Sequence, residues 1–237
     1  MLFWLAVWQL GSMAVHQEIL LVSPLNAFRT LIELLGERSF YAATGGSLFR
    51  ILIGFLLGFF LAILFAALAK IARPVRVLLE PLMATVKATP VASFVILALI
   101  WISSTNLSIF MSLLIVLPAV YQNVLDGLDR ADKKLIEMAE VFGLSFSGRV
   151  RAIYAPAAFP YLLTAAKLSL GMCWKAGIAA EVIAQPQNSI GTALQRAKVF
   201  FATPDLFAWT IAIIFISVLF EKAAVAVINR LSRRLYD

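Results

Sequence analysis

The residues that could do chemistry in this chain are charged side chains within or at the edges of long apolar segments. They are Lys87, Lys167, Lys175 and Glu181, and Trp174 directly precedes one of them. A charge near the centre of a bilayer costs on the order of 3 kcal/mol on insertion scales, so such residues usually face a cavity or a partner. Lys175 and Glu181 are six positions apart and do not share one face of a straight helix. We therefore expect any partners on other helices.

Lys87, Trp174 and Lys175 would suit a pathway for an anion, and Glu181 is the fourth candidate for its lining. The alternative is that the lysines extend to the membrane interface or pair with backbone groups. Both interpretations need helices that cross a bilayer and hold these residues at depth.

Other kinds of site find little support in the sequence. The chain has one cysteine, Cys173, and one histidine, His16, so neither an intrachain disulfide nor a Cys/His metal cluster can form. Cys173 lies in an apolar segment and is expected to be a small core residue. The sequence contains no phosphate-binding GxxxxGK[ST] string and no paired acids within one apolar segment. We expect no catalytic residues, no metal and no cofactor on this chain.

The composition indicates an integral membrane protein. Of 237 residues, 62% are hydrophobic and 14% charged, with a mean hydropathy of +0.93. A soluble domain is about 45–50% apolar and about 25% charged. The net charge of +7 comes from basic residues clustered at the ends of apolar segments, as membrane orientation signals are. Nucleic-acid binding is therefore not expected.

The hydropathy pattern predicts an all-α integral membrane fold of about six transmembrane helices. The stretch from Ala88 to Leu125 has no charge and would make about 57 Å of helix, too long for one crossing, so SSTN at 103–106 must break it. The expected spans are roughly residues 2–20, 46–69, 77–101, 107–125, 157–180 and 206–228.

This pattern divides the chain into three parts. Residues 1–22 form a first transmembrane helix, since no basic residue precedes the apolar run and no clean cleavage site follows it. Residues 23–45 form an extracytoplasmic surface helix, with Ser23 as N-cap and Pro24 at the first helical position. Residues 46–237 form the transmembrane core.

Two details of the core concern packing and orientation. Gly54 and Gly58 make a GxxxG pair, which either lets another helix approach closely or is simply tolerated in an apolar helix. If there are six spans, most basic residues fall on one side, which the positive-inside rule assigns to the cytoplasm together with both termini. The residues on that side are Lys70, Arg73, Arg76, Arg130, Lys133, Lys134, Arg149, Arg151, Arg230, Arg233 and Arg234, against Arg29, Arg38, Arg196 and Lys198 on the other.

A polar stretch at 126–156, which we name the insert, separates two apolar segments. Its first half predicts a short helix capped by Asp132, with Leu135, Met138, Ala139 and Phe142 on one face and Gly143 at the C′ position. A second helix restarts after Ser145 or Ser147 and runs to Pro156. So small a unit leaves apolar side chains in water. The insert therefore lies on the lipid surface or docks a cytoplasmic partner.

The spacing of the insert resembles the signature loop of ABC transporter permeases of the binding-protein-dependent import type. That pattern is Glu-Ala-Ala, three residues, Gly, nine residues, Ile, one residue, Leu and Pro. Its matching positions here are Glu137, Ala139, Gly143, Ile153 and Pro156, whereas Met138 and Ala155 replace an Ala and the Leu. The resemblance runs from about residue 20 to the C-terminus, and SLFRILIGFLLGFFLA, LLEPLMATVKATPVASF and MCWKAGIAAEVIA resemble helices of the nitrate/sulfonate/taurine branch.

The resemblance implies a permease subunit in a bacterial inner or plasma membrane, coupled to separate ATPase subunits that bind ATP in the cytoplasm. It implies an extracytoplasmic substrate-binding protein, a second permease chain, as a homodimer, and a small sulfonate, nitrate or vitamin precursor as cargo. The insert would be the coupling loop, with Ile153 and Pro156 at the entry to the next helix. The docking residues would be Glu137, Ala139, Val141, Phe142, Gly143, Leu144 and Ser145.

Two rival interpretations remain. A self-contained secondary transporter or channel predicts intramembrane charge pairs and no stable cytoplasmic partner. A membrane scaffold predicts no nucleotide-dependent change in the spans.

Overall fold

The structure is a computed structural model that describes residues 2–15, 17 and 19–236, and it contains helices and no strands within those residues. A π-helical turn, η1 (Val150–Tyr154), leads directly into α9. The α-helices are α1 (Leu2–Val15), α2 (Pro24–Leu35), α3 (Arg38–Ile71), α4 (Arg73–Ala88), α5 (Val91–Ala98), α6 (Ser104–Asp129), α7 (Lys133–Val141), α8 (Phe146–Arg149), α9 (Ala155–Ala184), α10 (Ile190–Val199) and α11 (Thr203–Tyr236).

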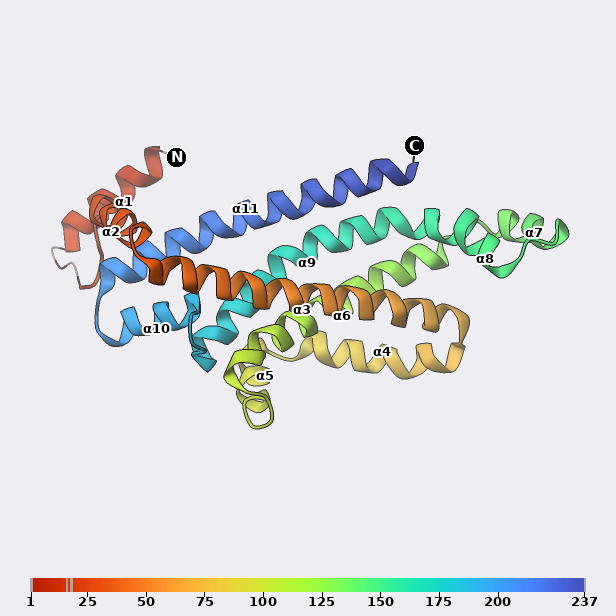
Figure 1. The fold of residues 1–237 in the computed structure, drawn as a ribbon, viewed down its shortest axis with the longest axis horizontal. Coiled ribbons are helices and arrows are strands. Elements are labelled where there is room, and N and C mark those ends of the chain that lie inside the picture. Colours follow the sequence, from red (N-terminus) through yellow and green to blue (C-terminus); the bar gives the residue numbers. More distant parts are fainter. Residues whose placement is uncertain (1, 16, 18, 237) are drawn as a thin grey trace.

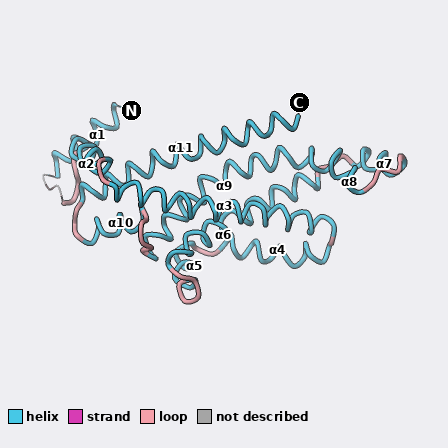
Figure 2. The backbone as a smooth tube through the Cα atoms, in the orientation of Figure 1, coloured by secondary structure: helices cyan, strands magenta, loops and turns pink. Residues whose placement is uncertain are grey.

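The helices form an elongated bundle (Figure 1). The long helices α3, α6, α9 and α11 run along its length, and α4 turns back from the end of α3. The insert, with α7 and α8, projects from one end, whereas α1, α2 and α10 gather at the other. Most of the chain is helical and the connections are short (Figure 2). The expected all-α class is therefore confirmed.

Close packing of α3, α6 and α9 depends on glycine. A Cβ added at Gly54 would collide with the backbone carbonyl of Ile109 on α6, and one added at Gly58 would lie 2.8 Å from the carbonyl oxygen of Leu113. Gly177 on α9 lies in the same way against Ile51. The GxxxG pair therefore brings two helix backbones together, which decides between the two interpretations of these glycines.

Two of these helices, α6 and α9, are joined by hydrogen bonds inside the bundle. Ser108 Oγ donates to the carbonyl of Gly177 and Ser112 Oγ to that of Cys173, each at 3.4 Å. Cys173 is fully buried, as expected of a small core residue. Hydroxyls thus use backbone carbonyls as acceptors between apolar helices, where water cannot satisfy them.

The number of spans differs from the prediction. Among the described residues, α3, α6 and α11 are long and apolar enough to cross a membrane, and α4 with α5 gives a fourth candidate if the bent pair is one span. The expected span at 77–101 is broken between Ala88 and Val91, where the two helices meet at 103°. α9 coincides with the fifth expected span but carries two lysines and is outside this set. The count of six stays a prediction.

The first two parts of the chain also differ from their predicted bounds. The helix expected over residues 2–20 ends at Val15, and its 14 residues span about 21 Å, less than a hydrocarbon core of about 30 Å. His16 lies outside the described residues. Ser23 caps α2 as predicted, accepting a hydrogen bond from the Asn26 amide at 3.3 Å. The surface helix ends at Leu35 and not at residue 45, because α3 already begins at Arg38.

Candidate functional site

The first half of the insert folds as its local chemistry predicts. The Asp132 carboxylate accepts from the Lys134 amide at 2.9 Å and starts α7. Gly143 has φ +68°, and the Leu144 amide donates to the Ala139 carbonyl at 2.8 Å, which closes the helix in a Schellman motif. A side chain at position 143 would be strained by this backbone even though no other atom crowds it.

The second half of the insert is joined to the first by an ion pair. Ser145 Oγ accepts from the Gly148 amide at 3.2 Å and begins α8. Arg149 Nη1 lies 2.9 Å from Glu140 Oε1, which links α8 to α7. From Phe146 the chain stays helical through η1 and into α9 without a break. The insert is therefore a structured hairpin of two helices, attached directly to a long helix of the bundle.

The insert presents apolar side chains to the outside. Val141 is 85% exposed and Phe142 74% exposed, and Glu137 is exposed beside them. Ala139 is buried in a small cluster with Ala131. Ala139 was predicted to dock a partner together with Phe142, but it is 5% exposed, so it supports the fold of the insert and does not lie on its surface.

The remaining predicted residues of this region divide in the same way. Leu144 and Ser145 are exposed, with the Ser145 hydroxyl capping α8. Ile153 is buried in the small cluster with Ala139, and Pro156 lies in the first turn of α9. The predicted residues of the insert thus fall into two groups. One group is exposed and can contact a partner, and the other is buried and supports the fold of the insert.

A group of ion pairs lies at the same end of the bundle. Asp129 at the end of α6 accepts from Lys70 of α3 and from Arg76 of α4, each at 2.8 Å, and Arg76 also pairs with Glu80 at 2.9 Å. The Lys70 ammonium lies 5.8 Å from the Tyr154 ring centroid, just before α9. These contacts tie the ends of four segments together next to the insert.

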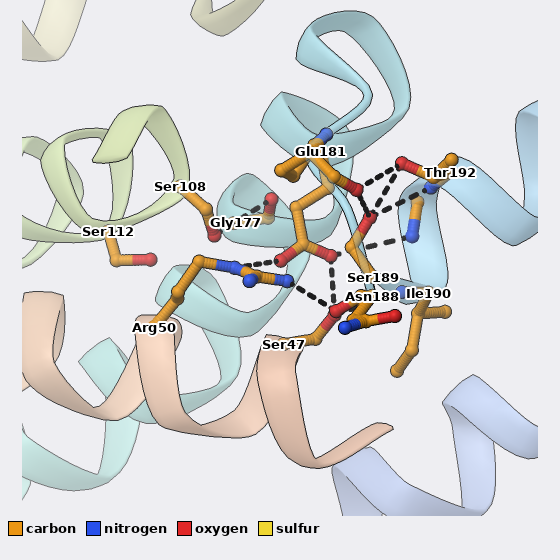
Figure 3. A network of polar contacts seen from close by, with 12 residues as sticks. Ser47, Arg50, Ser108, Ser112, Gly177, Glu181, Asn188, Ser189, Ile190 and Thr192 are labelled. Atoms are coloured by element: carbon orange, nitrogen blue, oxygen red, sulfur yellow. Dashed lines mark hydrogen bonds and ion pairs between the residues drawn. The ribbon is translucent and has the colours of Figure 1, made fainter. Parts of the chain in front are cut away.

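Glu181 belongs to a buried polar network deep in the bundle (Figure 3). Glu181 has no exposed surface, and its Oε1 accepts from Arg50 Nε at 3.0 Å. Its Oε2 accepts from Ser47 Oγ at 2.5 Å and from the Gly191 amide at 3.4 Å. The carboxylate is thus both charge-paired and hydrogen-bonded, which a buried charge requires.

The network fixes the start of α10. Ser47 Oγ accepts from the Ile190 amide at 3.0 Å, and Arg50 Nη2 donates to the Asn188 carbonyl at 2.9 Å. Ser189 caps α10, accepting from the Thr192 amide at 3.1 Å. α3, α9 and α10 are therefore joined at one point (Figure 3).

Glu181 was a predicted site residue, whereas Arg50 and Ser47 were not. Arg50 opens the apolar run of the expected second span, so an intramembrane charge was visible in the sequence. Its partner is 131 positions away, and only the packing of α3 against α9 brings the two together.

The four predicted pathway residues do not form one surface. Lys87 and Lys175 are exposed, whereas Trp174 is 1% exposed and packs near Phe220, with ring centroids 5.8 Å apart. Glu181 is engaged with Arg50. Lys87 and Lys175 alone stay candidates for a pathway lining.

Among the described residues, no cluster of three or more His, Cys, Asp or Glu residues is placed to hold a metal ion. The candidate site has two parts. The exposed insert lies at one end of the bundle, and the buried pair of Arg50 and Glu181 lies toward the other.

Long apolar helices, a charge pair buried between them and an exposed helical hairpin at one end define a polytopic membrane protein that works with partners. The chain belongs to the family described as binding-protein-dependent transport system inner membrane component, which matches residues 11–236. It is therefore a permease component of an ABC importer. Its curated relatives place it in the nitrate/sulfonate/taurine branch.

The curated relatives include transport permeases for sulfonates. A Bacillus subtilis (strain 168) protein, named an aliphatic sulfonates transport permease, is 28% identical over 86% of this chain and 74% of its own length. The taurine transport system permease protein of Escherichia coli (strain K12) is 28% identical over 95% of this chain and 84% of its own length. These matches place the chain in the predicted branch.

A solved structure shares the fold. The crystal structure of an amino acid ABC transporter with histidines aligns with a TM-score of 0.56 and 19% identity, covering 81% of this chain and 89% of the other. The secondary-transporter rival predicted intramembrane charge pairs, and Arg50 with Glu181 is such a pair. Family membership nevertheless assigns the chain to the ABC permeases.

Proposed function

We propose that the insert is the docking element for a cytoplasmic ATPase, which binds and hydrolyses ATP while this chain forms the pathway. The single observation that carries this assignment is the exposure of Val141 and Phe142 at the tip of a structured hairpin. Apolar side chains on a folded, capped element are covered by a partner in a working assembly. Gly143 holds the tip in one conformation through its positive φ.

The distribution of charge supports a cytoplasmic place for the insert. The turn from α3 to α4, whose flanking residues include Lys70, Arg73 and Arg76, lies at the same end of the bundle as the insert (Figure 1), and the insert itself carries several basic residues. The positive-inside rule puts this end in the cytoplasm. The C-terminal end of α11 points toward the same end, whereas α1 lies with α2 and α10 at the other, so this arrangement does not support the predicted cytoplasmic N-terminus (Figure 1). The opposite end, with α2 and α10, then faces the substrate-binding protein.

The exposed lysines support a pathway between two copies of this chain. Lys167 and Lys175 lie on the outward face of α9, and Lys87 is exposed near the end of α4. An ammonium facing lipid would cost on the order of 3 kcal/mol, so this face turns toward a partner or water. A second copy opposite it would enclose an aqueous, positively charged passage.

The cargo that fits such a passage is a small anion or zwitterion. The named relatives carry aliphatic sulfonates and taurine, both of which bear a sulfonate group. Lysine ammonium groups bind such anions through charge-assisted hydrogen bonds. We assign a sulfonate-like solute to this chain as its substrate class, with nitrate and vitamin precursors as the other cargo of the branch.

Co-purification from native membranes in mild detergent tests the docking assignment. Phe142→Asp places a charge on the docking surface, and an ATPase that accompanies the wild-type chain should be lost. Phe200→Asp is the matched control, because Phe200 is 77% exposed and directly follows α10, which lies at the opposite end of the bundle (Figure 1). Equal recovery of the ATPase with both variants would overturn the assignment, as would a wild-type chain that purifies alone.

A further inference from the structure

The outer side of α4 carries an apolar groove that ends at an arginine. The groove has a volume of about 530 Å³ and is lined by Arg73, Pro74, Val77, Leu78 and Pro81. Val77 is 63% exposed and Leu78 74% exposed, so these side chains have no cover from the rest of the chain. In a membrane-spanning helix, such a groove meets lipid or another apolar segment.

A second, polar cavity adjoins the groove. It has a volume of about 560 Å³ and shares Arg73 and Val77 with the groove. Three cations and two carboxylates line it. They are Lys70, Arg73 and Arg76, with Glu80 and Asp129.

Only some of the cations in the polar cavity form ion pairs with its carboxylates. Lys70 is paired with Asp129 at 2.8 Å, and Arg76 is paired with both carboxylates. Arg73 makes no ion pair within the part of the chain that the structure describes, and it is exposed. The Arg73 guanidinium, which lines both the polar cavity and the apolar groove, is therefore available to an anion.

We propose that these two adjoining cavities bind an anionic phospholipid, with the phosphate at Arg73 and an acyl chain along Val77, Leu78 and Pro81. The arrangement matches an amphiphile, since a negative head and an apolar tail need a cation and an apolar groove side by side. Basic pockets at the cytoplasmic ends of membrane helices are the usual place for anionic headgroups. A guanidinium also suits the phosphate by offering two parallel N–H donors.

The position of the site gives the lipid a structural task. The turn from α3 to α4 lies at the end of the bundle that carries the insert (Figure 1), and Lys70 connects it to Tyr154 just before α9. A lipid held at Arg73 would stabilise the ends of α3 and α4 against one another. The proposal depends on the chain lying in a membrane and not on the assignment of the insert to an ATPase.

Native mass spectrometry of the purified full-length protein, with whatever subunits accompany it, tests the proposal. The protein in neutral detergent is titrated with phosphatidylglycerol and, separately, with phosphatidylcholine. Wild type should retain phosphatidylglycerol with at least about fivefold preference, the scale of one basic residue at an anionic lipid surface. Arg73→Gln should remove the preference, and Arg73→Lys should restore most of it. Leu78→Gln should weaken both lipids.

The matched control is Arg230→Gln, which removes the same charge from an exposed position near the end of α11 and outside both cavities. This variant should keep the wild-type preference. An unchanged preference in Arg73→Gln, or an equal loss in Arg230→Gln, would overturn the site. Displacement of phosphatidylglycerol by millimolar inorganic phosphate would show a soluble-anion site and would likewise overturn the lipid assignment. Helical circular dichroism and a single elution peak exclude misfolding as the cause of any loss.

Discussion

Arg50 Nε lies 3.0 Å from Glu181 Oε1 in the interior of the bundle, and the pair joins α3 to α9 across 131 positions of sequence. Both residues are also hydrogen-bonded to the α10 region, Glu181 through the Gly191 amide and Arg50 through the Asn188 carbonyl. The network satisfies backbone groups at the start of α10 as well as balancing two charges. Its removal should therefore disturb more than one helix.

Arg50→Met should destabilise the fold by about 3–5 kcal/mol, because it leaves the Glu181 carboxylate buried without its counter-charge. The double variant with Glu181→Met should recover a large part of this loss, since no unpaired charge remains. Unfolding of the detergent-solubilised protein by heat or denaturant measures both. Arg29→Met is the control, because Arg29 pairs with Glu33 on the surface and its loss should cost less than about 1 kcal/mol. Equal effects of Arg50→Met and Arg29→Met would contradict the buried pair.

Gly58→Val should separate α3 from α6, because a Cβ at this position already lies 2.8 Å from the Leu113 carbonyl oxygen. Overpacking of this kind costs about 1–3 kcal/mol and more when backbone must move. The melting temperature in detergent should fall clearly. Gly171→Val is the comparison, since no other atom lies within 4 Å of a Cβ there. Equal melting temperatures for Gly58→Val and Gly171→Val would show that stability does not need the close approach of α3 and α6.

Gly143→Val should abolish ATPase-coupled uptake while the chain remains inserted in the membrane. The φ of +68° strains a β-branched residue by about 1–3 kcal/mol, and the tip of the insert then changes shape. Uptake of labelled taurine or another sulfonate into cells, together with the amount of chain in membranes, measures both parts of the prediction. Gly45→Val serves as control at an open position in α3. Normal uptake by Gly143→Val would contradict the role of the insert.

Lys175→Met should weaken the transport of an anionic solute, by about tenfold in KM, the scale of one lost hydrogen bond to a charged group. Lys222→Met removes an exposed lysine from α11 and should leave uptake unchanged. The two variants are compared by initial uptake rates over a range of solute concentrations. Unaltered rate and affinity in Lys175→Met would make that lysine a structural residue.

Local features of this protein were predictable from the sequence because neighbouring residues determine them. The caps at Ser23 and Asp132 and the glycine ending at Gly143 follow from side-chain and backbone chemistry within a few positions, and the structure confirms all three. The small-residue pair at Gly54 and Gly58 indicated a helix contact, although not which helix would make it.

Features that depend on tertiary packing were not predictable in the same way. The bend after α4 occurs near Pro90, which the sequence shows, but the 103° angle accompanies the packing of Val95 against α6 and α9. The burial of Ala139 depends on the small cluster that it forms with Ala131 and Ile153 within the insert. The partner of Glu181 required the fold of the whole bundle.

The uninterrupted helical path from Phe146 to Ala184 has a mechanical consequence. No loop interrupts this path between Phe146 and Glu181, since even η1 keeps the backbone helical. Under the proposed function, a displacement that the ATPase imposes on the insert would reach Glu181 along this helix, and Glu181 holds the start of α10 through Ser47 and Gly191. The insert at one end of the bundle and the start of α10 toward the other are thus connected through one helical path, and Arg50 pairs with Glu181 near the end of that path.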